Sequence, residues 1–198
     1  MRKIVDSDQD LSPKLRNSYS GHLDLKPLRD FCREYGERIE LPRRTLFQRA
    51  GERDVRIAYI ERGGVCYLGA ADNGRRQVVG FGFEGGFAVD WQAFVRRSNG
   101  MMDIETIEAS TLLTVDSDRF SEFMDCNLQL RCCISEALLT GISDNMLGLY
   151  LLSPEQRFLK VMERYPGLPN RMSMTEIASF IGIEPESLSR IRRRLCSR

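Results

Sequence analysis

The chain has 198 residues, of which 42% are hydrophobic and 29% charged, and its net charge is +1. This composition is that of a globular protein and excludes collagen-like, disordered and disulfide-scaffold classes. No apolar run approaches the roughly 20 residues of a membrane-spanning helix. Three aspartates near the N-terminus also stand where a signal peptide has its apolar segment, so we expect a cytoplasmic protein that binds no membrane.

The cysteine and histidine content argues against a metal site. Six cysteines include no C-x-x-C pair, and a single histidine is too few for zinc sites or histidine-based triads. We expect no catalytic residues, no metal and no required cofactor. Cys126, Cys132 and Cys133 could form a ligand set or thiol switch, but we interpret them as small buried hydrophobes on a helix. We interpret His22 as a surface residue rather than a haem ligand.

The first predicted element is a helix from about Asp24 to Tyr35, where apolar residues recur at helical spacing. After it, short segments rich in β-branched and aromatic residues alternate with glycine-containing turns, which predicts antiparallel hairpins. The predicted strands are Arg38–Leu41, Thr45–Gln48, Val55–Ile60, Val65–Ala71, Arg76–Phe83, Asp103–Glu108 and Thr111–Val115. Roughly seven or eight strands between residues 36 and 116 predict a jelly-roll barrel.

From Ser117 to about Leu152 the pattern is helical, with a break near Asp125, and the second helix carries two apolar stripes. One stripe contains Leu138, Ile142 and Leu149, and we expect it to lie on the barrel. The other contains small residues that allow a second copy of the chain to approach closely: Leu130, Ile134, Ala137, Gly141, Asn145 and Gly148. Asn145 would fix the register of this homodimer. The alternative is a helix buried in its own chain.

Two capping boxes begin the C-terminal part of the chain. Ser153 with Gln156 starts one helix, and Ser173 with Glu176 starts another. From Met174 onward the sequence MTEIASFIGIEPESLSRI places a small residue, a turn glycine and apolar residues as a helix-turn-helix requires. Residues 153–198 also hold nine Lys and Arg against five Asp and Glu, so double-stranded DNA is the expected partner.

The last helix, residues 185–195, has a polar side suited to DNA. When it is placed on a helical wheel, Leu188, Ile191 and Leu195 face the core. The residues expected to contact base edges in the major groove are Glu186, Ser189, Arg190 and Arg193. The residues expected to contact phosphates are Ser187, Arg192, Arg194 and Arg198. A solvated basic helix end is the alternative interpretation.

With these features the chain resembles the Crp/Fnr, or catabolite-activator, family of bacterial transcription regulators. The resemblance covers nearly all of residues 24 to 195 and is most specific in IASFIGIEPESLSRIRRRL, where Glu186, Ser189 and Arg190 match the family's base-reading pattern. It implies an α+β fold with a cyclic-nucleotide-binding-like barrel in residues 1–116, dimerisation helices in 117–152 and a helix-turn-helix domain in 153–198. It also implies that the chain regulates transcription from a two-fold symmetric promoter site, with RNA polymerase as a partner.

The chain departs from the family at two places. Only three residues follow Leu195, so we expect no β-hairpin wing. Where family members grip cyclic nucleotides with Gly-Glu and a later Arg, this chain has Val89-Asp90 and then Gly100 or Asp103. We therefore expect an effector pocket that does not take cyclic AMP and place it at Gly82, Gly86, Phe87, Val89 and Asp90. The alternative is a cyclic-nucleotide-responsive regulator with a rearranged phosphate loop that uses Arg96 or Arg97.

An enzyme is the remote alternative. Gly80 to Gly85 fits G-x-G-x-x-G, with Asp103 or Glu105 about 20 residues on, as in dinucleotide-binding oxidoreductases. The flanking hairpins, however, do not supply the strand–helix–strand unit in which that motif binds a dinucleotide. We therefore expect these glycines to serve bends of the barrel and the protein not to be an enzyme.

Overall fold

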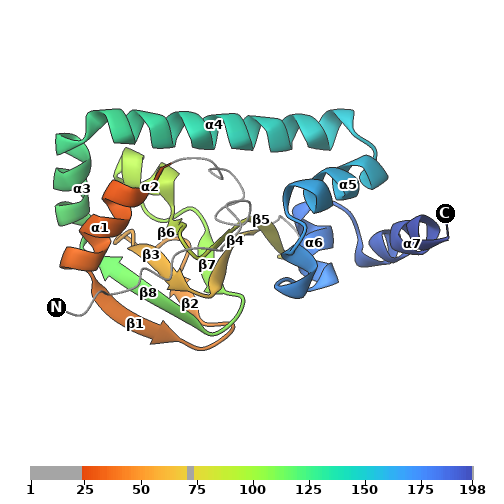
Figure 1. The fold of residues 1–198 in the computed structure, drawn as a ribbon, viewed down its shortest axis with the longest axis horizontal. Coiled ribbons are helices and arrows are strands. Elements are labelled where there is room, and N and C mark those ends of the chain that lie inside the picture. The colour runs from red at the N-terminus through yellow and green to blue at the C-terminus, as the bar shows by residue number, and fades with distance from the viewer. Residues whose placement is uncertain (1–23, 71–73, 198) are drawn as a thin grey trace, which may run out of the picture.

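The computed structural model describes residues 24–70 and 74–197 and has the predicted α+β class. An antiparallel barrel lies under one long helix, and a compact helical module follows at the far end of that helix (Figure 1). The helices are α1 (Lys26–Tyr35), α2 (Trp91–Arg96), α3 (Ser117–Cys126), α4 (Leu128–Leu151), α5 (Pro154–Arg164), the 3-10 turn η2 (Leu168–Asn170), α6 (Met174–Phe180) and α7 (Pro185–Cys196). His22 lies outside the described residues.

The barrel consists of two four-stranded sheets in a jelly-roll arrangement. The strands are β1 (Glu37–Leu41), β2 (Leu46–Gln48), β3 (Ile57–Arg62), β4 (Gly64–Ala70), β5 (Arg76–Phe83), β6 (Phe87–Val89), β7 (Asp103–Thr106) and β8 (Ser110–Val115). One sheet has the order β1-β8-β3-β6 and the other β2-β7-β4-β5. Every described pair of strands is antiparallel, so the hairpin prediction is confirmed.

Both sheets turn apolar side chains into the space between them. Phe47 on β2, Ile60 on β3, Ile104 on β7 and Leu112 on β8 are almost completely buried there. Alternate residues of a strand point to opposite faces, so each strand supplies this interior with every second side chain. The sequence pattern missed the short strand β6 and the short helix α2, because three and six residues are too few to show a period.

Three helices close one end of the barrel. Leu28 and Cys32 of α1, Phe120 and Met124 of α3 and Ile134 of α4 pack together against β3 and β8. From this cluster α4 runs along the whole molecule to the helical module at the other end (Figure 1). None of the described helices is long and apolar enough to cross a membrane.

Candidate nucleic-acid interface

The helix-turn-helix is built from α6 and α7 as the spacing predicts. The capping box at Ser173 starts α6, and Gly182 forms the turn with φ +69°, a left-handed conformation that favours glycine. A Cβ atom at Gly182 would also lie 3.0 Å from Cδ2 of Leu149. Glu184 and Pro185 then start α7, whose Leu188 and Ile191 are buried in the module. The buried pair leaves the opposite side of α7 in solvent.

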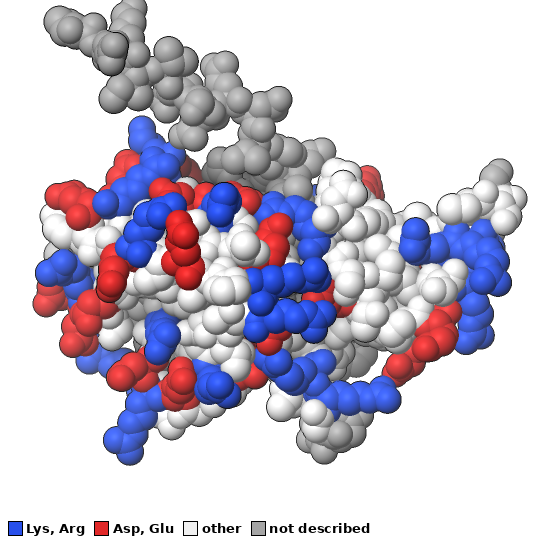
Figure 2. Space-filling model, turned by 90° about the horizontal axis from the view of Figure 1, so that it is seen from below, with Lys and Arg blue, Asp and Glu red and all other residues white. Residues whose placement is uncertain are grey.

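The exposed side of α7 carries the four residues predicted to read bases. Glu186, Ser189, Arg190 and Arg193 are all exposed. In the space-filling view, Lys and Arg side chains gather at the end of the molecule that holds α7 (Figure 2). The structure therefore brings two carboxylate or hydroxyl groups and two guanidinium groups onto one accessible helix face, where they can meet a surface that presents both donors and acceptors.

The residues predicted to bind phosphate differ in their surroundings. Arg192 is exposed, and Ser187 is half-buried. Arg194 forms an ion pair with Glu155 of α5, so its charge is already partly neutralised. Arg198 lies outside the described residues. On the turn before α7, Glu184 pairs with Arg75 of the β4–β5 hairpin at 3.5 Å.

The helical module that contains α5, α6 and α7 is packed directly on the barrel through α6 and β5. Oγ of Ser179 accepts a hydrogen bond of 2.9 Å from the backbone N–H of Val78, as an extra partner at the edge of the sheet. The ring of Phe180 meets that of Phe81 edge-on at 5.0 Å between centroids, and Tyr165 meets Phe81 at 5.1 Å. Barrel and module thus share one continuous apolar cluster.

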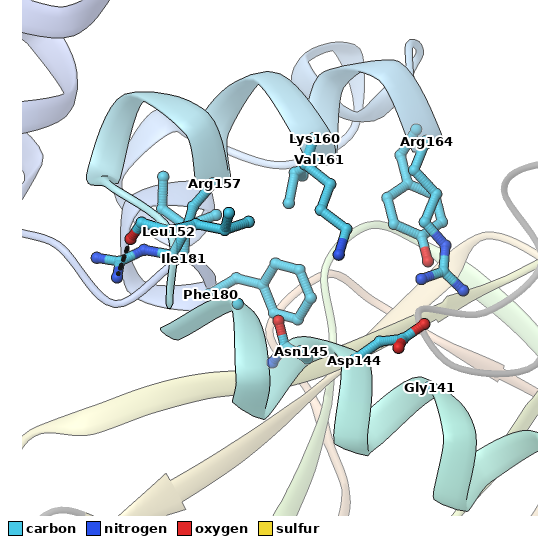
Figure 3. A pocket seen from close by; sticks show the side chains of 12 residues that line it. Gly141, Asp144, Asn145, Leu152, Arg157, Lys160, Val161, Arg164, Phe180 and Ile181 are labelled. Atoms are coloured by element: carbon cyan, nitrogen blue, oxygen red, sulfur yellow. Dashed lines mark hydrogen bonds between the residues drawn. The ribbon is translucent and has the colours of Figure 1, made fainter. Parts of the chain in front are cut away.

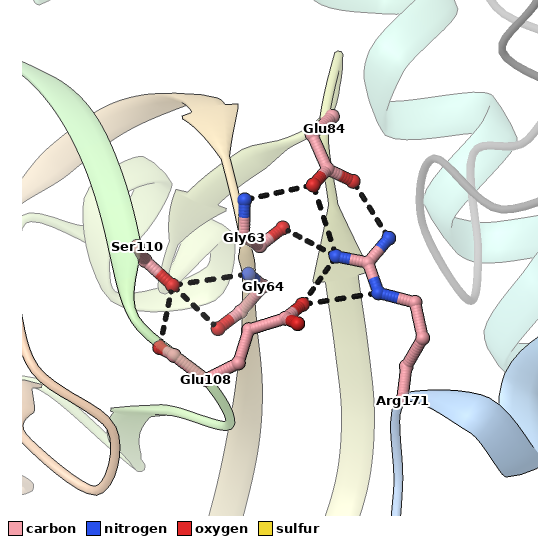
Figure 4. A network of polar contacts seen from close by, with 6 residues as sticks. All are labelled: Gly63, Gly64, Glu84, Glu108, Ser110 and Arg171. Carbon is pink, nitrogen blue, oxygen red and sulfur yellow. Dashed lines mark hydrogen bonds and ion pairs between the residues drawn. The ribbon is translucent and has the colours of Figure 1, made fainter.

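A charge cluster around Arg171 fixes the same junction from the turn before α6 (Figure 4). Its guanidinium donates to both carboxylate oxygens of Glu84, at 2.7 and 3.0 Å, and to Oε1 of Glu108 at 3.0 Å. It also donates to the backbone oxygen of Gly63 at 3.1 Å and lies 4.2 Å from the centroid of the Phe83 ring. Such bidentate, partly buried contacts are the strong class of ion pair. We call this set the Arg171 cluster.

Glu84 remains charged at neutral pH within this cluster. Burial on its own raises the pKa of Glu84, but hydrogen bonds from Arg171 and from the backbone N–H groups of Glu84 and Gly63 outweigh it and lower that pKa. The backbone at Gly63 approaches closely enough to donate because it has no side chain: a Cβ there would lie 2.3 Å from Oγ of Ser110.

The predicted small-residue stripe of α4 faces its own chain. Ile134 and Gly141 are buried, and Gly141, Asn145 and Gly148 line a small space of about 40 Å³ against α5 and α6 (Figure 3). Here Arg157 of α5 donates to the carbonyl oxygens of Leu149 and Leu152, whose places at the end of α4 leave them without helical partners. The stripe therefore admits α5 and α6, and our assignment of it to a second copy is not supported by this packing.

A different face of α4 is apolar and exposed. Its large exposed side chains are Leu128, Leu139, Ile142, Met146, Leu147, Leu149, Tyr150 and Leu151. Seven positions along this side of α4 follow the alternating steps of four and three residues that define a coiled-coil seam. They are Leu128, Cys132, Ser135, Leu139, Ile142, Met146 and Leu149, and we call them the α4 seam. Most of them are exposed, but Ser135 is half-buried and accepts a hydrogen bond from Trp91 of α2. Cys126 and Cys132 are exposed, so the interpretation of the helix cysteines as buried hydrophobes is wrong for these two.

Three of the five predicted effector residues line a cavity of about 630 Å³ between the barrel, α1, α2 and α4. Phe87, Val89 and Asp90 line this cavity. Gly82 and Gly86 do not: Gly82 pairs with Val65 within the sheet, and Gly86 belongs to the turn between β5 and β6.

Gly100 and Asp103 stand where family members have a phosphate-binding arginine, and in this chain they have other roles. Gly100 packs so closely that a Cβ there would lie 2.5 Å from Nε2 of Gln48. The carboxylate of Asp103 accepts from the backbone N–H of Ala50 and pairs with Arg76 at 3.1 Å. Neither position contributes a cation to the cavity.

The glycine motif from Gly80 to Gly85 belongs to the barrel. It covers the end of β5 and the turn that follows, and β5 pairs antiparallel with β4. Gly85 takes φ +78° in that turn. Among the described residues the motif is thus flanked by antiparallel strands and not by the strand–helix–strand unit of a dinucleotide site, as the hairpins predict.

We compared the chain with known proteins to find which of them share this architecture. No family model and no curated protein sequence matches the chain. Solved structures do match. CLP of Xanthomonas campestris, described as a c-di-GMP-responsive global regulator, is 19% identical with a TM-score of 0.66, over 88% of this chain and 92% of that one. FixK2 of Bradyrhizobium japonicum is 18% identical with a TM-score of 0.65, over 82% and 85%.

A third matching structure is described as a member of a named family. A transcriptional regulator of the CRP/FNR family from Thermus thermophilus, TTHA1359, is 14% identical with a TM-score of 0.64, over 81% of this chain and 86% of that one. The chain therefore has the Crp/Fnr fold, and the resemblance drawn from its sequence is confirmed at the level of the fold.

Replacing Arg171 by methionine should lower the free energy of unfolding by about 2 kcal/mol, because Glu84 and Glu108 lose their partner while Glu84 remains largely buried. Arg38→Met is the matched control: Arg38 also joins two glutamates, Glu40 and Glu61, but on the exposed surface. Urea unfolding should detect little change for this control. Equal losses for the two variants would contradict a special role for the Arg171 cluster.

The loss of unfolding free energy caused by Arg171→Met should also depend on pH. The pKa of Glu84 is lowered in the folded chain, so its contribution is complete above about pH 4 to 5, where an unpaired glutamate titrates, and is lost as pH falls through the lowered value. The difference in stability between wild type and Arg171→Met should therefore shrink on acidification. A difference that stays constant down to about pH 3, below the ordinary glutamate range, would show that packing, and not charge, holds the junction.

Proposed function

We propose that this protein is a DNA-binding regulator of transcription that inserts α7 into the major groove. The observation that carries the proposal is the exposed face of α7, where Glu186, Ser189, Arg190 and Arg193 stand opposite the buried Leu188 and Ile191. A recognition helix needs its base-reading side free and its other side fixed, and the docking of α6 on β5 supplies the fixed side.

This proposal assigns different tasks to the basic residues. Arginine can donate two hydrogen bonds to guanine, and a glutamate can accept from cytosine, so Arg190, Arg193 and Glu186 suit sequence recognition. Arg192 and Ser187 lie toward the flank of the helix and suit phosphate contacts, which position the protein without reading sequence. Arg194 can join them only by giving up its ion pair with Glu155.

We further propose that two copies associate through the α4 seam. Its heptad spacing and the exposure of Leu139, Ile142 and Met146 fit a parallel pair of helices, in which like positions face each other. Two-fold symmetry would then present two α7 helices to a symmetric site with half-sites about 34 Å apart. This arrangement replaces the small-residue stripe as the interface between copies.

The remaining parts of the proposal follow the family. We place the sensor barrel in residues 1–116, the dimerisation helices in 117–152 and the DNA-binding domain in 153–198. We propose RNA polymerase as the partner on the promoter, the cytoplasm as the compartment and the cavity beside Phe87, Val89 and Asp90 as the effector site. We assign no catalytic role to any residue and no cyclic AMP to the cavity.

Arg190→Ala should relax sequence preference, whereas Arg192→Ala should weaken binding to all DNA about equally. Both side chains are exposed on α7 and carry the same charge, so they form a matched pair. One bidentate base contact is worth about 1–3 kcal/mol of discrimination, and one phosphate contact reduces the salt slope by about one per half-site. Competition between the preferred duplex and a scrambled duplex at several salt concentrations separates the two effects. A parallel loss for both variants would contradict base reading by α7.

Met146→Glu should convert the dimer to a monomer, because each copy would place a carboxylate against its counterpart in an apolar seam. Leu159→Glu on α5 is the control, since Leu159 is similarly exposed but lies outside the seam. Sedimentation at micromolar concentration measures both. Wild-type protein that sediments as a monomer would contradict the proposed dimer.

Cys132 provides a second test of the same seam. In the parallel pair the two Cys132 side chains face each other, so mild oxidation should link the copies when Cys126, Cys133 and Cys196 are replaced by serine. The two buried cysteines do not interfere, because burial raises the pKa of Cys32 and that of Cys66 to about 12. In the control, Cys126, Cys132 and Cys133 are replaced by serine and the exposed Cys196 is kept. This control protein should remain unlinked.

A further inference from the structure

We infer that the cavity between the barrel and α4 binds a largely apolar molecule with a single anionic group, held at its mouth by Arg96. The inference deepens the proposed effector site and rests on the proposed function only in treating the molecule as a regulator of DNA binding. The binding itself follows from the lining of the cavity, whose volume of about 630 Å³ lies within the roughly 300–1,000 Å³ range of ligand sites.

Apolar side chains from every surrounding element form most of the wall. Leu25 and Leu28 come from the start of α1, Phe87 and Val89 from β6, and Phe120 from α3. The long helix contributes a further row: Ile134, Leu138, Leu139 and Ile142. A molecule that fills this space removes much hydrocarbon surface from water, which is the main source of affinity for an apolar ligand.

Asp90, Tyr67 and Trp91 in the wall are hydrogen-bonded within the protein. Both carboxylate oxygens of Asp90 accept backbone hydrogen bonds, from Ala93 at 3.1 Å and Met101 at 2.6 Å, so Asp90 caps α2 and closes the loop behind it. The hydroxyl of Tyr67 donates to the carbonyl oxygen of Phe87 at 2.7 Å. Trp91 donates from its ring N–H to Ser135 at 3.3 Å and so joins α2 to α4.

Arg96 is the only cationic side chain among the described residues of the wall. It lies on the last turn of α2, is exposed, and has no ion-pair partner within the described part of the chain. A carboxylate on the ligand would form an ion pair with this guanidinium. Because the pair would lie at the mouth of the cavity, both groups would keep part of their hydration. The hydrocarbon part would point inward, toward Leu138 and Phe87.

A cyclic nucleotide fits this wall poorly. It would bring a phosphate, ribose hydroxyls and base edges into a space whose carboxylate and hydroxyl groups are already hydrogen-bonded. Polar groups that enter an apolar site without partners lose their hydration uncompensated. A single charge at the mouth avoids that loss, which is why the lining selects for an apolar molecule with one anionic end.

The test uses three probes on the full chain without DNA: dodecanoate, dodecan-1-ol and cyclic AMP. Titration calorimetry should show binding of the first two and none of the third. Arg96→Gln should weaken dodecanoate about fivefold and leave dodecan-1-ol unchanged, since only the carboxylate uses the guanidinium. Arg97→Gln is the matched control, because Arg97 is the adjacent exposed arginine but does not line the cavity.

Two further variants locate the binding. Leu138→Trp should weaken binding of both alkyl probes, because the larger ring takes up part of the cavity beside Phe87. If that variant fails to fold, Val95→Glu answers the same question from the exposed rim of α2, since its carboxylate should repel dodecanoate. Leu151→Glu, at an exposed position of α4 that belongs neither to the α4 seam nor to the cavity wall, must leave binding intact. Loss of binding in Leu151→Glu, or unchanged binding in Leu138→Trp, would place the alkyl chain on the exposed helix and overturn the inference.

These outcomes can be separated from failure of the proposed function. A protein that binds dodecanoate as described but binds no DNA would retain the cavity assignment and refute the regulator. A protein that binds DNA but neither alkyl probe, or one that binds cyclic AMP with micromolar affinity, would retain the regulator and refute the apolar ligand.

Discussion

The docking of α6 on β5 determines how the rest of the molecule is arranged. A module of residues 153–198 is too small to bury a large core by itself, and it completes its core with Phe81, Phe83 and neighbouring barrel side chains. The Arg171 cluster adds a directional component, because a bidentate pair with Glu84 tolerates little rotation. The orientation of α7 is therefore set by the barrel and not by a flexible linker.

The long helix α4 connects the three regions to which we assign functions. Its inner stripe of small residues accepts α5 and α6, and its flank with Ile134 and Leu138 forms a wall of the cavity. The α4 seam is largely exposed and shares Leu139 and Ile142 with the rim of that cavity. The end of α4 is tied to the module by Arg157, which reaches Gly182 as well as the last carbonyl groups of the helix. A ligand in the cavity and a second copy on the seam would thus both contact α4, the helix that leads into the helical module.

The sequence was sufficient for the elements and insufficient for their partners. Alternating strands, glycine turns and two capping boxes are local signals, and they predicted the barrel hairpins and the helix-turn-helix. The faces of α4 could not be assigned from the sequence, because apolar residues surround that helix and periodicity does not say which face meets which partner. The heptad steps through Leu139, Ile142 and Met146 were visible in the sequence and would have indicated the outer seam.

Other features had no sequence signal at all. The Arg171 cluster joins residues 63, 84, 108 and 171, which come together only in the folded chain. Asp90 stood at the position of a ligand-binding residue, yet its side chain caps α2 and holds the backbone of Met101. A carboxylate in a sequence does not reveal whether backbone N–H groups will occupy its oxygens.

The most direct measurement of the central claim is selection of bound duplexes from random DNA by the full chain, followed by sequencing of the enriched pool. Two copies that each present α7 should enrich a two-fold symmetric sequence whose half-sites are centred about 10 base pairs, one helical turn, apart. A pool without enrichment, or one enriched in a single asymmetric half-site, would contradict the account.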